Sequence, residues 1–487
     1  MSTPRRAIIA SDGVFSYDDL DEASRRVAGS LLADNEDLNQ TRVAFLVHPS
    51  FAYAAVQRGI WRAGGVAVPL AVSHPPAELE YVIRDADAGI VVADSVSAAV
   101  LAPLARAAHG RFVAVDDALR ARPAEGLPHL GSNRRAMIIY TSGTTGRPKG
   151  VVSTHEVIGA QIASLVEAWR WTPSDHLLLV LPLHHVHGII NGLGSSLAVR
   201  ATCEILSAFD AERVWARLAS GEITVFTAVP TIYHRLISAW EAAAPQVRRQ
   251  RSDRVRGLRL MMSGSAALPV KTLERWREIS GHTLLERYGM TEIGMALANP
   301  LNGDRRPGCV GSPLPGVEVR LVDEAGSEVT GNVPGELEVR GPSVFLEYWR
   351  RPDETAAAFR DGWFRTGDVA VFENGSYRLL GRTSVDIIKT GGYKVSALEI
   401  EEVLRTHPAI AECAVVGVSD DDWGECVSAA VELQHGASLT LDDLQQWARP
   451  QLAPYKIPRA LQHVSSLPRN AMGKVVKPEV AGLFKSR

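Results

Sequence analysis

The sequence contains few cysteines and no excess of charge of either sign. Its four cysteines, Cys203, Cys309, Cys413 and Cys426, are scattered along the chain and form no C-x-x-C pair. This distribution argues against a disulfide framework and against a cysteine-ligated zinc site. The net charge of −3 gives no support to a nucleic-acid partner or to an anionic membrane surface, since both favour basic patches.

Long apolar runs are also missing. The N-terminal segment has no apolar stretch of the length that a signal peptide needs. The richest apolar region, "LLLVLPLHHVHGIINGLG" at residues 177–194, is interrupted by Pro182 and three histidines, so it makes a poor membrane span. Together with the scattered cysteines, these absences predict a cytoplasmic protein with no membrane partner.

The length and the pattern of the chain predict several domains. A chain of 487 residues exceeds one ordinary hydrophobic core, and its 46% hydrophobic and 22% charged residues are typical of a globular protein. Helix-like segments such as residues 16–33 alternate with strand-like segments such as residues 42–48, which predicts an α/β fold with largely parallel sheets. From about residue 308, short strands separated by Pro and Gly predict a small β-subdomain, and an α+β segment follows after about residue 382.

One short loop, "YTSGTTGRPKG" at residues 140–150, concentrates glycines, hydroxyl groups and a lysine. Glycines let the backbone approach an anion closely, and the hydroxyls and the ammonium are donors that suit a phosphate. The spacing differs from the Walker motif G-x-x-x-x-G-K-[ST], because Lys149 follows Arg147 and Pro148 and is itself followed by Gly150. The loop therefore predicts polyphosphate binding of another kind than that of kinases and GTPases.

Five stretches in order suggest a family: the loop at 140–150, "LPLHHVHG" at 181–188, "ERYGMTE" at 286–292, "WFRTGD" at 363–368 and "PRNAMGK" at 468–474. Their identity and order resemble the acyl-adenylate-forming superfamily, which includes acyl-CoA synthetases. The resemblance implies a large N-terminal domain of layered α/β subdomains plus a small β-subdomain (residues 1–381) and a small mobile α+β C-terminal domain (382–487). It also implies ATP, Mg²⁺ and CoA: a carboxylate attacks the ATP α-phosphate, and a thiol then displaces AMP.

The resemblance assigns ATP binding to residues of these motifs and of "SGSAALP" at 263–269. They are Thr141, Ser142, Gly143, Thr144, Thr145, Gly146, Lys149, Ser265, Ala266, Tyr288, Thr291, Asp368 and Arg382. The hydroxyl-rich loop and Lys149 would hold the β- and γ-phosphates and neutralise the leaving pyrophosphate. Tyr288 would stack on adenine and Thr291 would donate to the α-phosphate. Asp368 would accept from both ribose hydroxyls, and Arg382 resembles the family's ribose or phosphate contact.

Three residues are implied to be catalytic. Lys474 would bridge the attacking carboxylate and the α-phosphate, and Glu292 would supply a hard oxygen ligand for Mg²⁺. His185 would gate the carboxylate step and later the thioester step. Three close histidines could also indicate zinc, but their spacing matches no usual ligand pattern, and a ring packed in the core is a further alternative.

The segment after "GR" at 381–382 resembles the family's hinge and the loop beyond it. The spacing is one residue longer than usual, so either Ser384 or Asp386 could be the pivot. The glycine-rich loop that follows would let a pantetheine arm pass close to its backbone, which assigns CoA contact to Gly391, Gly392, Tyr393 and Lys394. No carrier domain or phosphopantetheine-serine motif follows in the sequence, which favours free CoA as the acceptor.

The predicted acid pocket is polar. Its residues are Arg287, His187, Ser263, Val186, Met290 and, with a weaker signal, Arg235. The Arg287 fork could hold a second carboxylate in a bidentate pair, and the bulk of Val186 and Met290 would limit α-substituents. The alternative is a structural Arg287 that pairs with Glu286 or with a surface acid.

Two segments, residues 281–297 and 381–399, resemble the malonyl-CoA synthetases in particular, which implies malonate, with methylmalonate as a second substrate. Three alternatives stay open at the level of the sequence. The chain could activate short monocarboxylates, or adenylate an acid and load it onto a separate carrier protein. It could also be a non-catalytic nucleotide-binding protein, although the presence of Lys474, Glu292 and Asp368 argues against that.

Overall fold

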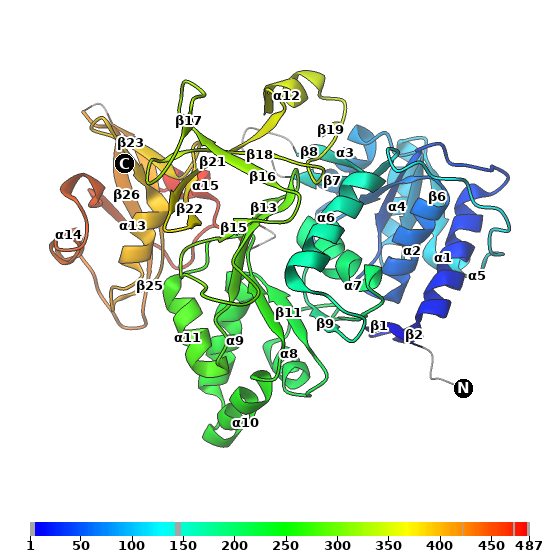
Figure 1. The fold of residues 1–487 in the computed structure, drawn as a ribbon, viewed down its shortest axis with the longest axis horizontal. Helices are drawn as coiled ribbons and strands as arrows, with labels where there is room; N and C mark the ends of the chain where they lie inside the picture. The colour runs from blue at the N-terminus through cyan, green and yellow to red at the C-terminus, as the bar shows by residue number, and fades with distance from the viewer. Residues whose placement is uncertain (1–4, 142–147, 421, 471–472, 485–487) are drawn as a thin grey trace.

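A computed structural model of the chain describes residues 5–141, 148–420, 422–470 and 473–484. Figure 1 shows a large body, coloured from blue to yellow-green along the chain, and a smaller orange and red body attached at one side. Six residues of the predicted phosphate loop, 142–147, lie outside the described residues, and they include the predicted ATP contacts Ser142, Gly143, Thr144, Thr145 and Gly146.

The first sheet lies in the N-terminal part of the large body. Its strands are β3 (Arg42–Leu46), β4 (Val66–Pro69), β5 (Ile90–Ala93), β6 (Arg111–Ala114), β7 (Arg135–Thr141), β8 (Lys149–Thr154) and β19 (Glu347–Tyr348). They run in the order β19-β8-β7-β4-β3-β5-β6, and β3 to β6 pair in parallel. Parallel strands need crossover connections, which the helices between them supply. The predicted α/β fold is confirmed here.

The second sheet occupies the middle of the large body. Its strands are β1 (Arg6–Ala10), β2 (Gly13–Ser16), β9 (His176–Leu179), β10 (Thr202–Ile205), β11 (Val225–Ala228), β12 (Leu260–Ser263), β13 (Leu285–Met290), β14 (Gly294–Ala298) and β15 (Ser312–Pro313). The central strands β10, β9, β11, β12 and β13 are parallel, whereas β14 and β15 are antiparallel. Ser263 and Met290 therefore lie at the carboxyl ends of strands, the edge at which open parallel sheets bind ligands.

Helices cover both sheets. They are α1 (Tyr17–Leu32), α2 (Phe51–Arg62), α3 (Pro76–Asp85), α4 (Ala98–Ala107), α5 (Val115–Arg120), α6 (His155–Trp169), the π-helix η1 (His187–Gly194), α7 (Ser195–Ala198), α8 (Ala211–Leu218), α9 (Pro230–Ala242), α10 (Pro245–Val255) and α11 (Val270–Ser280). Helix α1 begins where its sequence predicts, because Ser16 and Asp19 form a reciprocal capping box. Its buried face carries Leu20, Val27 and Leu31, at helical spacing.

A small antiparallel sheet follows, as the Pro- and Gly-punctuated pattern predicts. Its strands are β16 (Glu318–Val322), β17 (Glu328–Val329), β18 (Gly335–Arg340), β20 (Phe359–Arg360), β21 (Trp363–Glu373) and β22 (Ser376–Arg382), with α12 (Pro352–Ala357) beside them. Strands β21 and β22 pair with Asp368 opposite Arg382. Two residues from separate motifs thus become cross-strand neighbours.

The smaller body contains the remaining elements. They are β23 (Ile387–Thr390), β24 (Tyr393–Ser396), α13 (Ala397–Leu404), β25 (Ile410–Asp420), β26 (Gly424–Leu433), α14 (Leu441–Ala448), η2 (Pro454–Lys456), β27 (Ala460–His463) and α15 (Lys477–Gly482). It has a hydrophobic core of its own, formed by residues such as Ile388, Ile400, Val415 and Leu444. A separate core is what an independent C-terminal domain needs.

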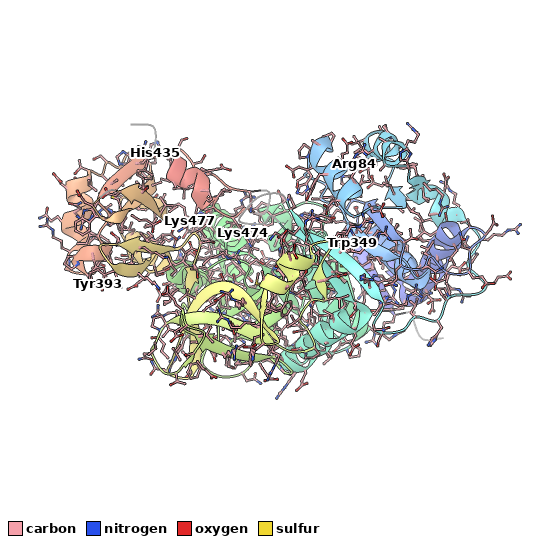
Figure 2. All side chains as sticks on the ribbon, turned by 90° about the horizontal axis from the view of Figure 1, so that it is seen from above. Arg84, Trp349, Tyr393, His435, Lys474 and Lys477 are labelled. Carbon is pink, nitrogen blue, oxygen red and sulfur yellow. The ribbon has the colours of Figure 1, made fainter. Side chains whose placement is uncertain are left out.

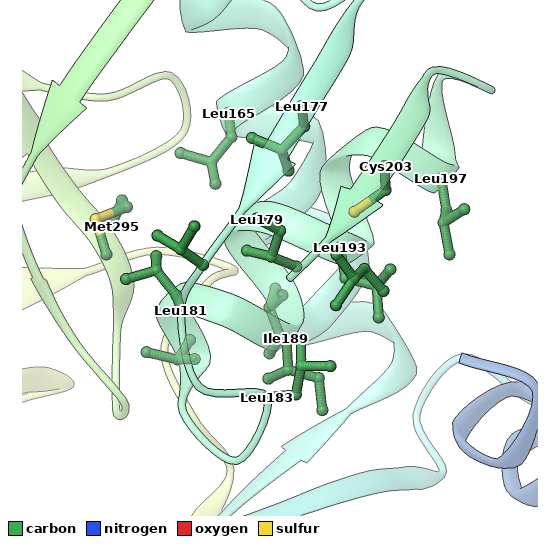
Figure 3. Close-up of a cluster of buried hydrophobic side chains, with 14 of the residues drawn as sticks. Leu165, Leu177, Leu179, Leu181, Leu183, Ile189, Leu193, Leu197, Cys203 and Met295 are labelled. Atoms are coloured by element: carbon green, nitrogen blue, oxygen red, sulfur yellow. The ribbon is translucent and has the colours of Figure 1, made fainter. Parts of the chain in front are cut away.

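The apolar side chains of residues 177–194 are buried in the core of the large body, on both sides of the histidines in the sequence. Figure 3 shows Leu177, Leu179, Leu181 and Leu183 packed against side chains of η1. A side chain at Gly192 would press on Leu179, so this glycine allows the π-helix to lie close to β9. Within the part of the chain that the structure describes, no helix is both long enough and apolar enough to cross a membrane.

Candidate active site

The predicted phosphate loop joins two antiparallel strands at the edge of the first sheet. Thr141 ends β7, Lys149 begins β8, and the two residues face each other across the ladder. The Lys149 ammonium forms an ion pair with Glu354 and lies 5.3 Å from the ring centroid of Tyr348. Glu354 thus balances the positive charge of Lys149, the residue that the sequence predicts to bind the ATP phosphates.

The predicted ribose acceptor lies in a hydrogen-bonded cluster. Asp368 accepts a hydrogen bond from the Tyr288 hydroxyl at 2.6 Å and one from Arg382 Nε at 3.1 Å. Burial, followed by the charge of Asp368, raises the pKa of Tyr288 well above its ordinary value, so the phenol stays a donor. The structure brings these three predicted residues together, with the carboxylate oriented by two donors.

Glu292 lies close to this cluster and is almost completely buried. Its Oε1 accepts a hydrogen bond from the Tyr348 hydroxyl at 2.9 Å, and burial raises the pKa of its carboxyl. A bound cation would favour the charged carboxylate. In the described residues, no group of three or more His, Cys, Asp or Glu could hold a metal ion. A single protein carboxylate is enough for Mg²⁺ when phosphate and water supply most of the other ligands. It is not enough for a metal site formed by protein ligands alone.

The two central histidines have distinct settings, and both are neutral. His187 Nδ1 lies 3.1 Å from Ser265 Oγ, and Nε2 lies 2.8 Å from Thr227 Oγ1 and also contacts Arg287 Nη2. A guanidinium only donates, so Nε2 is the acceptor and Nδ1 carries the proton. Burial lowers the pKa of His185 to about 3 and that of His187 well below 6.5. These contacts occupy both His187 nitrogens and argue against the zinc alternative.

Arg287 is the most unusual charge in this pocket. Its residue is only 2% exposed, and burial lowers the pKa of the guanidinium to about 9. Nη2 contacts His187, whereas Nε and Nη1 have no hydrogen-bond partner in the described structure. The Ser263 hydroxyl, also buried, has none either. Buried donors are normally satisfied, so this group of donors lacks an acceptor.

The alternative in which Arg287 pairs with Glu286 does not fit the strand. Adjacent residues in a strand point to opposite faces. Glu286 Oε1 instead accepts a hydrogen bond from the Leu268 amide at 3.2 Å, and burial raises the pKa of Glu286 to about 8. Glu286 therefore does not supply a carboxylate partner for Arg287.

Lys474 reaches the same region from the smaller body. Figure 2 shows it at the boundary between the two bodies. Lys474 is an exposed residue, yet partial loss of water lowers the pKa of its ammonium, with Arg382 adding to this effect and Asp368 opposing it. Lys474 in turn helps to lower the pKa of His185. The Lys474 ammonium is thus within electrostatic range of both Asp368 and Arg287.

Arg235 is the predicted substrate residue that the structure removes from the pocket. It lies on α9 two positions after Tyr233, whose hydroxyl donates to the Met262 carbonyl on β12. Two residues along a helix are about 200° of rotation, so Arg235 faces the opposite side. It is exposed, and its guanidinium lies 5.9 Å from the ring centroid of Phe209. The prediction of a second-carboxylate contact at Arg235 is therefore corrected: it is a surface residue.

The other predicted pocket residues lie at element ends around Arg287. Val186 is buried directly before η1, and Met290 is half-buried at the end of β13. Thr291 is buried, and Ser265 has a positive φ of 70° that turns the chain next to Ala266. Their contacts with a bound substrate stay predictions.

The predicted CoA residues form the turn of the β23–β24 hairpin. Gly391 and Gly392 have φ values of 54° and 81°, which favour glycine. Tyr393 stacks on Tyr455 with ring centroids 4.2 Å apart, and Lys394 forms an ion pair with Glu324. Figure 2 shows Tyr393 at the outer end of the smaller body, away from Lys474. In this arrangement the hairpin does not reach the pocket.

Sequence reasoning missed Gly264, Thr227 and Tyr348. A Cβ at Gly264 would overlap Arg287 Nη1, so the absence of a side chain makes room for the guanidinium. Gly264 stands between two candidate residues in "SGSAALP", a signal that could have identified it. Thr227 and Tyr348 contact His187 and Glu292 from distant segments, and no local pattern marks them.

Comparisons with known proteins agree with this geometry. Residues 2–349 match the family described as AMP-binding enzyme, and residues 399–474 match its C-terminal domain. The chain is 48% identical to the mitochondrial malonate–CoA ligase ACSF3 of Bos taurus, over 98% of this chain and 88% of the relative. Two crystal structures of MatB from Rhodopseudomonas palustris are 36% identical, covering 100% of this chain and 97% of MatB. The TM-score is 0.93 for the ATP-bound form and 0.82 for the apo form.

These relatives correct the predicted cytoplasmic location. Four curated relatives, at 46% to 50% identity, are named as mitochondrial enzymes. The prediction used the scattered cysteines and the missing signal peptide, which argue only against an oxidising, secretory route. Neither feature distinguishes the cytoplasm from other reducing compartments.

Proposed function

Because the chain belongs to the AMP-binding enzyme family, we propose that it ligates malonate to CoA in an ATP-dependent reaction through a malonyl-adenylate. The products are malonyl-CoA, AMP and pyrophosphate. Curated relatives carry the name malonate–CoA ligase. Methylmalonate is the second acid that we propose, with Val186 and Met290 limiting the size of the α-substituent.

The observation that supports malonate most directly is the buried, unsatisfied guanidinium of Arg287. A charge in such a setting is costly unless it is paired. A substrate carboxylate would accept from Nε and Nη1, and the Ser263 hydroxyl would add a further donor. A monocarboxylate would leave these donors unpaired, so the pocket discriminates against it.

The second carboxylate of the diacid is the nucleophile of the first step. Lys474 and Arg287 are close enough for the positive charge of Arg287 to lower the pKa of Lys474. A three-carbon diacid held at Arg287 by one end would present its other carboxylate to Lys474 and to the α-phosphate. Holding both reactants in this way removes most of the entropic cost of their encounter. His185, which is neutral, would pack beside the reacting carboxylate without adding charge.

ATP would lie across the strand ends, with its ribose on Asp368 and its phosphates toward Lys149. Lys149 would exchange Glu354 for phosphate oxygens. Glu292 would hold Mg²⁺, whose charge stabilises the leaving pyrophosphate.

The second step needs the CoA thiol in place of Lys474. We propose that residues 382–487 form a mobile C-terminal domain, separate from residues 1–381, that turns after pyrophosphate leaves. The turn would withdraw Lys474 and bring the hairpin with Gly391, Gly392, Tyr393 and Lys394 to the pocket.

The test is CoA-dependent AMP formation with ATP and Mg²⁺, comparing malonate, methylmalonate, acetate and butyrate at equal concentration. Strong preference for the two diacids supports the proposal. Preference for acetate or butyrate overturns the malonate assignment and keeps the adenylating mechanism. AMP formation only with a carrier protein as acceptor overturns the CoA assignment, and nucleotide binding without AMP from any acid overturns the enzyme itself.

A further inference from the structure

Lys477 lies three residues after Lys474, at the first position of α15, and its ammonium is fully engaged. Nζ lies 3.1 Å from Asp386 Oδ1, donates to the Val415 carbonyl at 2.7 Å, and contacts the Glu401 carboxylate. The Lys477 side chain is only 11% exposed. An ammonium has three N–H donors, and each has an acceptor here. Lys477 therefore fixes the chain on the C-terminal side of Lys474.

Asp386 is the partner that belongs to the turn between β22 and β23. It ends the turn that follows β22, where its Oδ2 accepts a hydrogen bond from the Arg382 amide at 3.0 Å. Its own amide donates to the Arg382 carbonyl at 2.8 Å. A Cβ at Gly381 would overlap the Asp386 side chain, so the turn closes tightly only with glycine there. Asp386 thus clamps the turn with one carboxylate oxygen and holds Lys477 with the other.

This clamp connects Lys477 to the nucleotide end of the pocket. Arg382, whose amide Asp386 holds, donates through Nε to Asp368 at 3.1 Å. Ser384, inside the same turn, is exposed. The turn therefore has an exposed middle and an anchored end, and rotation about its middle would have to break the bonds between Arg382 and Asp386.

The N-terminal side of the Lys474 segment is held by a matching set of contacts. Arg469 pairs with Val475 in an isolated bridge, and its Nη1 donates to the Gly473 carbonyl at 2.8 Å. Arg469 also pairs with Glu412 at 3.4 Å, and Glu412 pairs with Arg405. Arg405 then pairs with Glu401 at 3.2 Å, the same carboxylate that Lys477 contacts. Both flanks of Lys474 are anchored to one buried acid.

We propose that Lys477 is a positioning residue for the first half-reaction: through Asp386 it ties the Lys474 segment to the hinge turn and so sets Lys474 against the acid and the α-phosphate. The proposal rests on the adenylation reaction proposed above. Only the adenylating arrangement needs Lys474 in the pocket, so the contact matters more for acyl-adenylate formation than for thioester formation. A compact ammonium suits this role because three acceptors converge on one point.

The experiment measures the two half-reactions separately. Malonate-dependent ATP–pyrophosphate exchange reports adenylation, and thioester formation from prepared malonyl-adenylate and CoA reports the second step. We expect Lys477→Met to slow exchange on the order of 10- to 100-fold, the scale of a misplacement of about 1 Å. Thioester formation should stay within about threefold of the wild-type rate.

Lys456→Met is the matched control. Lys456 pairs with Glu399 at 2.6 Å in the same body and is part-buried, but these contacts do not connect it to the turn. Its loss should leave the ratio of the two half-reactions unchanged. Asp386→Asn keeps an oxygen for the Arg382 amide and removes the charge that pairs with Lys477, so it should reproduce the selective loss of exchange even if Lys477→Met fails to fold. The double variant should be no slower than the slower single variant, because both act through one contact.

An equal loss of both half-reactions in Lys477→Met and Asp386→Asn, with a lower melting temperature, would make Lys477 a purely structural residue and overturn the proposal. Unchanged exchange in both variants would overturn it as well. If malonate fails in the wild-type protein, exchange is measured with the acid that the wild-type protein does activate. Failure of the malonate assignment is thereby distinguished from failure at Lys477. Wild-type protein that exchanges with no acid overturns both.

Discussion

Replacing Arg287 with methionine separates the contribution of this residue to substrate binding from its effect on folding. The substitution removes the charge and the donors but keeps an unbranched side chain in the space beside Gly264. If the pocket binds the distal carboxylate of malonate, the loss is that of one partner of a buried, hydrogen-bonded charge pair. Such truncations cost about 2 to 5 kcal/mol. We therefore expect kcat/KM for malonate to fall roughly 30- to 5,000-fold, at about 1.36 kcal/mol for each factor of ten.

The unfolding free energy of the Arg287→Met variant should rise, although its activity falls. Burial lowers the pKa of Arg287 from 12.5 to about 9. The folded state therefore binds this proton less tightly than the unfolded state. Burying the charged guanidinium lowers the unfolding free energy by the full amount below about pH 9, and this loss shrinks as the pH rises toward 12.5. The shift corresponds to about 5 kcal/mol at neutral pH. Methionine should recover part of it, about 1 to 4 kcal/mol of unfolding free energy, as in other buried charges replaced by apolar groups.

The assay compares kcat/KM for malonate and butyrate by AMP formation and measures unfolding free energy without substrates. Arg235→Met is the control, because it removes an arginine from the outer face of α9 and should leave both quantities unchanged. The affinity for ATP should be the same in all three proteins. Malonate turnover within threefold of wild type in Arg287→Met, or a clear loss of stability, would refute the reasoning.

Three other perturbations test the surroundings of Arg287. Gly264→Ala places a methyl group where Arg287 Nη1 lies, so malonate kcat/KM should fall at least tenfold with little change for ATP, measured by AMP formation. Adenylation requires charged Lys474, whose pKa is lowered, so ATP–pyrophosphate exchange should decline at a pH below 10.5. His185, with a pKa of about 3, should add no acid limb near pH 6.5. Glu292→Gln removes the proposed Mg²⁺ ligand, so exchange should fall by about two orders of magnitude and need more Mg²⁺, whereas malonyl-adenylate should still react with CoA within threefold.

Several of the site residues that the sequence predicts share one property: they stand at the ends of strands. Lys149 follows the phosphate loop at the start of β8, Ser263 ends β12, and Arg287 lies near the end of β13. Strands β12 and β13 are parallel neighbours in the second sheet, so Ser263 and Arg287 meet at its carboxyl edge, whereas Lys149 belongs to an antiparallel pair of the first sheet. The alternation of strands and helices predicted the fold class, whereas the prediction that several motifs form one site came from the family resemblance.

The errors have physical causes that a linear pattern does not contain. Arg235 was predicted, with a weaker signal than Arg287, as a residue of the acid pocket, and the phase of α9 turns it outward. The alternative pairing of Glu286 with Arg287 ignored the alternation of a strand. Tyr348 and Thr227 belong to segments without a recognisable motif, and only tertiary packing brings them to Glu292 and His187.

The arrangement of the smaller body supports two alternating states on geometric grounds. Lys474 and the Gly391–Gly392 turn are carried by one packed body, at separate ends of it, as Figure 2 shows for Lys474 and Tyr393. A rigid body cannot present both ends to one pocket at the same time, so the two proposed roles require rotation. Contacts of the present arrangement must then break, including the hydrogen bond from the Val270 amide to Glu402 at 3.0 Å and the exposed Lys394–Glu324 ion pair. The Lys394–Glu324 pair is exposed, so its loss should cost little. The Asp386–Lys477 contact lies within residues 382–487 and would turn with them, so its proposed role is to fix Lys474 relative to the hinge turn.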